Sequence, residues 1–133
     1  MSVELLRPFK LVYVASPYSG YAEGIDAAYE EVADLTGQLI KEGIPAISPI
    51  AHSHAVCECA GLDHYDHDLW LKMDAPLMEA CDAICVVEMA GWAVSKGVRI
   101  ELAAFANAEK PAFILNPNTF VCERLFPMEW SHA

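Results

Sequence analysis

The alternation of short apolar runs with longer amphipathic segments is the feature that most restricts the fold of this chain. Four runs continuous in β-branched, aliphatic or aromatic residues predict strands buried on both faces: 11–15, 44–48, 83–87 and 112–115. Apolar residues three or four apart predict helices over 21–42, 66–80 and 95–109. Strands that alternate with helices predict an α/β fold, a three-layer α-β-α sandwich around a mostly parallel, Rossmann- or flavodoxin-like sheet of roughly four to five strands.

Two segments lack a clear periodicity. Residues 50–66 are rich in histidine, cysteine and acidic side chains, and we expect a loop there with a short helix. Residues 116–133 carry scattered apolar side chains, which predict a tail that packs on another surface; a partner subunit in a homodimer or higher homo-oligomer is the candidate. The 133 residues are expected to form one domain, 1–133, that includes this tail.

Composition narrows the classes of partner. The formal net charge is −11, from 19 acidic and 8 basic residues, which argues against a nucleic acid polymer because that binding needs Lys and Arg to displace counterions. No window is long and apolar enough for a membrane span, and residues 1–8 lack the apolar stretch of a signal peptide. Five cysteines, an odd number, suit thiols in a reducing compartment. We therefore expect a cytoplasmic protein with no membrane partner.

Three polar loops are expected at one edge of the sheet, because right-handed crossovers bring the carboxyl ends of parallel strands together: 16–20, 48–54 and 88–97. In the third loop, Ser95 stands in an N-cap position, which leaves free backbone donors at a helix start. Glu101 follows about two turns later, and its carboxylate points either into this edge or into solvent. Asp74 lies in a mostly apolar helix, where a raised pKa would suit a proton donor; the alternative is a surface acid.

The first loop is neither a Walker loop nor a G-x-G-x-x-G turn, so it supports neither ATP hydrolysis nor Rossmann-type NAD binding. The hydroxyls of Ser16 and Ser19, with Gly20 ahead of a long helix, suit a phosphate or sugar oxygen at that helix start. Tyr13 and Tyr18 belong either to the same site or to the core.

The histidines and cysteines of 52–67 raise the question of a metal. The pairs His52-x-His54, Cys57-x-Cys59 and His64-x-x-His67 suggest a zinc-stabilised interaction module. However, C-x-C is not the C-x-x-C of zinc knuckles, and H-x-x-H lacks the four-residue step that aligns helix ligands. We therefore expect no metal and no cofactor, with His52 and His54 as pocket-rim donors or parts of a turn.

Taken together, these segments resemble the nucleoside 2-deoxyribosyltransferase-like superfamily, which includes 2′-deoxynucleoside 5′-monophosphate N-hydrolases. The resemblance runs from about residue 11 to 115, through Val12-Tyr-Val-Ala-Ser-Pro-Tyr18, the Asp74 helix with its following strand, and Ser95-x-Gly97-x-x-x-Glu101. Within that group the chain is similar to short bacterial and phage proteins of a domain-of-unknown-function family. These share Pro-Tyr-Ser, Ser-His, Leu-Trp-x-x-x-Asp and Gly-Trp-x-x-Ser-x-Gly-x-x-x-Glu, here at 17–19, 53–54, 69–74 and 91–101.

The resemblance implies an N-glycosidic hydrolase or transferase that acts on a (deoxy)nucleoside or its 5′-monophosphate. Glu101 would be the nucleophile of a covalent glycosyl-glutamate, Asp74 would protonate the leaving base or orient the sugar, and Tyr13 would complete the catalytic set. A serine at position 95, where the transferases carry an acid, favours a nucleotide. The expected substrate contacts are Ser16, Tyr18, Ser19, Gly20, His54, Gly91, Trp92, Ser95, Gly97 and Arg99. The alternative is a non-catalytic nucleotide sensor in which Glu101 binds a ribose hydroxyl.

Overall fold

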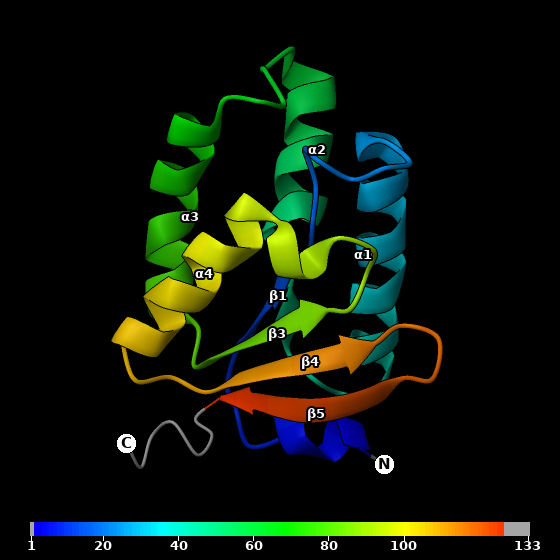
Figure 1. Cartoon of the computed structure of the whole chain (residues 1–133), viewed down its shortest axis with the longest axis vertical. Coiled ribbons are helices and arrows are strands. Elements are labelled where there is room, and N and C mark those ends of the chain that lie inside the picture. Colours follow the sequence, from blue (N-terminus) through cyan, green and yellow to red (C-terminus); the bar gives the residue numbers. More distant parts are fainter. Residues whose placement is uncertain (1, 127–133) are drawn as a thin grey trace.

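A five-stranded sheet forms the centre of the molecule (Figure 1). The computed structural model describes residues 2–126. The strands lie in the order β2-β1-β3-β4-β5; the first four are parallel and β5 is antiparallel to β4. Their bounds are β1 Val12–Ala15, β2 Ala46–Ile47, β3 Ala83–Val87, β4 Ala112–Asn116 and β5 Val121–Phe126. This strand order is flavodoxin-like, so the predicted α/β class is confirmed.

Helices cover both faces of this sheet (Figure 1). They are α1 Ile25–Lys41, α2 Pro49–Ala60, α3 His67–Ala80 and α4 Lys96–Asn107, with the 3₁₀ helices η1 Ser2–Leu6 and η2 Trp92–Val94. Side chains of η1 and α1 join one buried cluster with the sheet, and side chains of α3 and α4 join a second cluster on the opposite face. None of the helices within residues 2–126 is long and apolar enough to cross a membrane.

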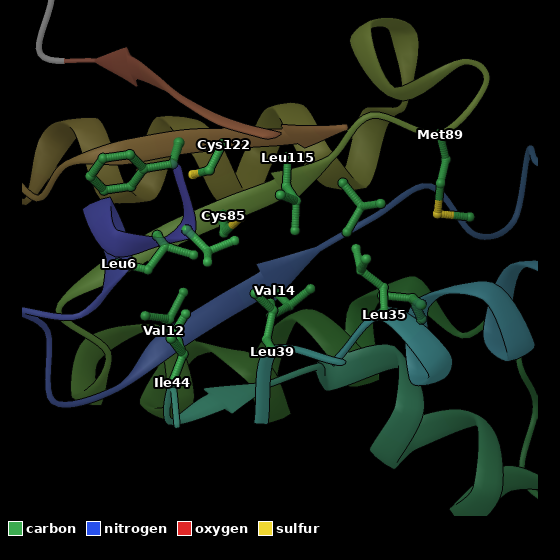
Figure 2. Packing of buried hydrophobic residues seen from close by; sticks show 14 of the residues in the cluster. Leu6, Val12, Val14, Leu35, Leu39, Ile44, Cys85, Met89, Leu115 and Cys122 are labelled. Carbon is green, nitrogen blue, oxygen red and sulfur yellow. The ribbon is translucent and has the colours of Figure 1, made fainter. Parts of the chain in front are cut away.

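Successive strand residues divide between these two clusters, as the period of two in a strand requires. Val12 and Val14 of β1 pack toward α1 and η1, where Figure 2 shows Val14 near Leu35 and Leu39. Tyr13 and Ala15 belong to the other cluster, against α3 and α4. The hydroxyl of Tyr13 is thus directed toward α4, which matters for the site below.

The segment 50–66, expected to be mostly loop, begins with a helix of 12 residues, α2. Ser48 caps it by accepting a hydrogen bond from the backbone N–H of Ala51, Pro49 occupies its first turn, and Gly61 ends it in the left-handed conformation. Its buried face includes His54 and Cys57. Hydrophobic periodicity misses a helix whose buried side chains include a histidine.

The expected tail is also corrected. Residues 121–126 form β5 and pair with β4, and Phe120, Leu125 and Phe126 pack on the two clusters of the chain's own core. Asn116 forms the preceding turn, because its side-chain oxygen accepts hydrogen bonds from the N–H groups of Asn118 and Thr119. Trp130, which belonged to the same prediction, lies outside the described residues.

The bounds of one helix and one strand differ from those predicted. The first long helix begins at Ile25 rather than at residue 21, with Gly24 as its N-cap, so Gly20 does not stand at a helix start as expected. The second strand shrinks to Ala46–Ile47. All five cysteines are thiols, as their odd number predicted.

Candidate functional site

A pocket of about 270 Å³ opens at the carboxyl ends of the strands. Strand order reverses between β1 and β3, and ligands of open α/β sheets bind at such a switch point. Four segments build the walls: the loop after β1, helix α2, the region of α3, and the first turns of α4. The lining residues are Ser16, Tyr18, Ser19, Ile50, Ser53, His64, His67, Asp68, Trp70, Leu71, Asp74, Ser95, Lys96, Gly97, Ile100 and Glu101.

Glu101 lies on the inner face of α4 and is only 9% exposed. The hydroxyl of Tyr13, on the interior strand β1, donates a hydrogen bond to its Oε2. Tyr13 is fully buried, and its ring packs against Phe105 with centroids 5.5 Å apart. Of the two orientations that the sequence left open for Glu101, the inward one is observed.

Asp74 faces the same pocket from α3 and interacts electrostatically with Glu101. Burial raises the pKa of Glu101 to about 8, and the nearby Asp74 charge adds to this while the Tyr13 hydrogen bond opposes it. Burial also raises the pKa of Asp74 to about 6, against an opposing effect of His52. Two carboxyl groups that share a pocket and titrate near neutrality are suited to acid–base and nucleophilic chemistry.

The start of α4 supplies donors beside these acids. Ser95 is its N-cap and accepts a hydrogen bond from the backbone N–H of Val98, as the sequence predicted. Lys96 and Gly97 line the pocket next to it. A helix N-terminus with an adjacent ammonium group attracts anions, so this end of the pocket is suited to a negatively charged group.

Ser16, directly after β1, is 3% exposed, and its hydroxyl finds no hydrogen-bond partner among the described residues although it lines the pocket. A buried hydroxyl without a partner is costly, and such groups are rare in folded proteins. A ligand in the pocket is a natural partner for this oxygen.

Tyr18 forms part of the pocket wall and is held between two histidines. Its hydroxyl lies 2.6 Å from Nδ1 of His54 and 2.7 Å from Nδ1 of His64. The other ring nitrogen of each histidine faces a carboxylate: Asp26 at 3.2 Å for His54, and Glu58 at 2.5 Å for His64. Burial raises the pKa of Tyr18, so this phenol stays protonated at neutral pH.

The expected site residues divide into three groups. Glu101, Asp74, Ser16, Tyr18, Ser19, Ser95 and Gly97 line the pocket, and Tyr13 reaches it through Glu101. His54 is buried behind Tyr18, is not part of the lining, and contacts the lining residues Tyr18 and His64. Outside the lining lie Gly20, Gly91, Trp92 and Arg99; Gly91 caps η2, and Trp92 packs on the core.

Sequence reasoning missed several pocket residues. It treated His64 and His67 as candidate zinc ligands, gave Lys96 and Ser53 no substrate role, and used Trp70 only for the helix face and its motif. The position of Lys96, directly after an N-cap at the ligand-binding edge, was a usable signal. His64, between α2 and α3, and His67, the first residue of α3, gave none, because the position of this part of the chain is known only once the chain is folded.

A second hollow, of about 240 Å³, lies between α3 and α4 and is lined by Ala75, Met78, Glu79, Ala104, Phe105, Ala108 and Lys110. The ammonium of Lys110 donates hydrogen bonds to the backbone oxygens of Met78 and Glu79. This hollow shares no lining residue with the pocket of Glu101.

Of the six histidines and cysteines that the sequence suggested as metal ligands, the structure places one, His54, in a group of potential ligands among the residues that it describes. Across residues 2–126, the group whose donor atoms lie within 4.8 Å of one another consists of Asp26, His54 and Glu58, with no cysteine. Cys57 is buried, which raises the pKa of its thiol, and Cys59 is exposed.

Fold and pocket together define an α/β protein of flavodoxin-like topology with two carboxyl groups in a pocket at the switch point of its sheet. The chain belongs to the family described as a domain of unknown function, DUF1937, whose model matches residues 10–117. The match spans β1 to β4, so it includes every residue of the pocket. A search of curated proteins found no match.

Proposed function

We propose that this protein cleaves the N-glycosidic bond of a (deoxy)nucleoside or its 5′-monophosphate, as a hydrolase or a transferase, through a covalent glycosyl-glutamate. The observation that carries the proposal is the pair of carboxyl groups, Glu101 and Asp74, in one pocket, with Tyr13 donating to the first. The resemblance to nucleoside 2-deoxyribosyltransferase-like proteins supplies the reaction class. The pocket itself supplies the groups that the reaction needs.

In the first step, a carboxylate oxygen of Glu101 attacks the anomeric carbon of the sugar. A C–O ester bond forms as the C–N bond breaks, and its electron pair leaves with the base, which takes a proton from Asp74. In the second step, water attacks the same carbon, its proton passes to Asp74, and Glu101 leaves as a carboxylate. Two displacements at one carbon retain the configuration of the sugar.

Tyr13 positions the nucleophile. Its hydroxyl donates to Oε2 of Glu101, which fixes the carboxyl plane and stabilises the ionised form in a buried place. The burial that raises the pKa of Glu101 also makes its carboxylate a stronger nucleophile once it is formed, because water does not solvate it. At neutral pH the proposed reaction thus requires the less populated, ionised form of Glu101.

The remaining lining residues suit the other parts of a nucleotide. The indole of Trp70 offers an aromatic surface for a base. The α4 N-terminus with Lys96 and Ser95 suits a 5′-phosphate, and the partnerless hydroxyl of Ser16 suits a sugar oxygen. These contacts favour a monophosphate over a free nucleoside.

The direct test is chromatography of free base after incubation with each deoxy- and ribonucleoside and its 5′-monophosphate. Glu101→Gln should abolish base release, while Glu109→Gln, an exposed acid just beyond α4, should leave it unchanged. Mass spectrometry of acid-quenched wild type should reveal a chain heavier by one glycosyl group. If no substrate yields free base or a modified chain, the enzymatic proposal is wrong.

One observation favours a second candidate, a nucleotide sensor without catalysis. A carboxyl group with a pKa of about 8 is mostly protonated at neutral pH, and in that form it binds a hydroxyl rather than attacks a carbon. Nucleotide binding measured by calorimetry, without release of base from any nucleotide, would support the sensor.

A further inference from the structure

We propose that Asp26, His54 and Glu58 bind one divalent transition-metal ion, with Zn²⁺ as the matching ion, behind the Tyr18 wall of the pocket. Asp26 stands in the first turn of α1, and the other two residues stand four apart on α2, where a helix places side chains on the same face. The three donor atoms lie within 4.8 Å of one another. Nothing in this proposal depends on the glycosidase chemistry.

The number of hydrogens available to Tyr18, His54 and His64 leaves one ring nitrogen without a hydrogen to donate. Tyr18 has one hydroxyl hydrogen and meets Nδ1 of both His54 and His64, so it donates to one ring and accepts from the other. The ring that donates from Nδ1 has, when neutral, a bare lone pair on Nε2. Both Nε2 atoms face carboxylate oxygens, so one lone pair meets a negative oxygen whichever way the chain of hydrogen bonds runs.

The distances indicate in which direction the hydrogen bonds of this chain run. Nε2 of His64 lies 2.5 Å from Glu58, a separation that requires a hydrogen between them, so a neutral His64 ring donates from Nε2 and accepts from Tyr18 at Nδ1. Tyr18 then accepts from Nδ1 of His54. The bare nitrogen is therefore Nε2 of His54, 3.2 Å from Oδ1 of Asp26.

A cation bound between the lone pair of His54 Nε2 and the carboxylate of Asp26 would turn this repulsive contact into two favourable ones. With Zn–N and Zn–O bonds of about 2.1 Å, two ligands of a tetrahedral ion lie about 3.4 Å apart, close to the observed 3.2 Å. The second nitrogen of His54 is held by a hydrogen bond from its own N–H to Tyr18, as metal-bound histidines require. His54 is 4% exposed and stacks on Tyr29 at 4.2 Å, so its ring is fixed before any ion arrives.

The chemical types of the ligand atoms indicate which ion is expected. One imidazole and two carboxylates suit a borderline ion such as Zn²⁺ better than Mg²⁺ or Ca²⁺, which prefer oxygen ligands alone. Three protein ligands leave a fourth position for water. Asp26 and Glu58 have side chains 81% and 59% exposed, so the ion has access from solvent. Binding would join the first turn of α1 to α2 and fix Tyr18 in the pocket wall.

The experiment is calorimetric titration of EDTA-treated protein with Zn²⁺ at neutral pH, with the zinc content measured after desalting. We expect one ion per chain, not displaced by excess Mg²⁺. Asp26→Asn and Glu58→Gln keep shape and remove a charge, and each should weaken the affinity at least tenfold. Tyr18→Phe should weaken it roughly 10–100-fold through loss of the hydrogen bond that holds His54.

Two matched variants serve as controls. Asp34→Asn changes an exposed acid on the same helix as Asp26, and Cys59→Ser removes the exposed thiol of α2; both should bind Zn²⁺ as the wild type does. The proposal is overturned if the wild type binds no stoichiometric Zn²⁺, which means that an extra proton on His54 or His64, rather than a metal ion, lets every nitrogen in the network face its partner favourably. It is also overturned if Cys59→Ser abolishes binding, or if Asp26→Asn and Glu58→Gln both leave it intact.

Discussion

The hydroxyl of Tyr13 donates a hydrogen bond to the carboxyl group of Glu101, 88 residues further along the chain, and both groups are buried. The bond joins the interior strand β1 to the second turn of α4. A strand residue whose ring is packed against Phe105 has little freedom, so it defines where the Glu101 carboxyl lies. The first prediction follows from this contact.

Tyr13→Phe keeps the ring and removes the hydrogen bond. Loss of a hydrogen bond to a charged acceptor, worth about 1.5–3 kcal/mol, should raise the pKa of Glu101 by about one to two units. The ionised nucleophile then becomes rarer, so the maximal kcat/KM for base release should fall about 10–100-fold and the alkaline limb of its pH profile should move upward. Tyr65→Phe, at an exposed tyrosine, is the control. An unchanged profile would show that Tyr13 does not act through Glu101.

The two carboxyl groups predict a bell-shaped pH profile. The proposed reaction needs Glu101 ionised and Asp74 protonated, and with pKa values of about 8 and about 6 that combination is a minority at every pH. Its population is largest near pH 7, about midway between the two values, and falls on both sides. The dependence of kcat/KM on pH for wild type tests this expectation; a profile that is flat between pH 5 and 9 contradicts it.

Asp74→Asn should change the shape of that profile. Without a titrating acid, only the ionisation of Glu101 remains, so residual kcat/KM should rise with pH and level off without an alkaline limb. The midpoint should fall somewhat below 8, because removal of the Asp74 charge lowers the pKa of Glu101. Substrates whose leaving group departs without protonation should show the smallest fall in kcat/KM relative to wild type. A bell that persists in this variant would exclude Asp74 as the proton donor.

Ser16→Ala tests whether the pocket binds a polar ligand. The Ser16 hydroxyl is buried without a partner among the described residues, so its removal should leave the free energy of unfolding unchanged or raise it by about 1 kcal/mol. If a sugar oxygen is its partner, KM should rise about 5–10-fold. Chemical denaturation and steady-state kinetics separate the two effects. A clear loss of stability would mean that the hydroxyl serves the fold instead.

Much of the fold was predictable because its signals are local. The run 83–87 and the Ser95 cap carry their own periodicity and hydrogen-bonding logic, and both are confirmed. Helix α2 was missed because its buried face includes His54, whose partners Tyr18 and Asp26 lie far away in sequence. Strand β5 was missed because it is an edge strand with a mixed burial pattern, which antiparallel pairing with β4 specifies.

The site was predictable only where the chain order places it. Topology brings the loop after β1 and the start of α4 to one edge, which is why Ser16 and Ser95 were expected there. The residues alone left the orientation of Glu101 open, and only the resemblance favoured a role in the site. The hydrogen bond from Tyr13 has no sequence signal, because an apolar strand gives no reason to prefer one face for a tyrosine. The contacts of Tyr18 with His54 and His64 depend likewise on tertiary packing.

The last prediction concerns stability, and it needs no substrate. The pKa of Glu101 is raised by burial from 4.5 to about 8, so between these values the folded chain holds a proton that the unfolded chain has released. The folded state is then disfavoured as pH rises, by at most about 1.4 kcal/mol per pH unit, and the loss levels off above pH 8.

Glu101→Gln cannot titrate, and its side-chain oxygen still accepts from Tyr13. Its melting temperature should match that of wild type near pH 4.5 and exceed it by several degrees near pH 9, measured by calorimetric scans in matched buffers. Glu109→Gln should follow wild type at both values. Equal melting temperatures for Glu101→Gln and wild type across this range would mean that Glu101 is already ionised in the fold at neutral pH, in which case the nucleophile would need no rare ionisation state.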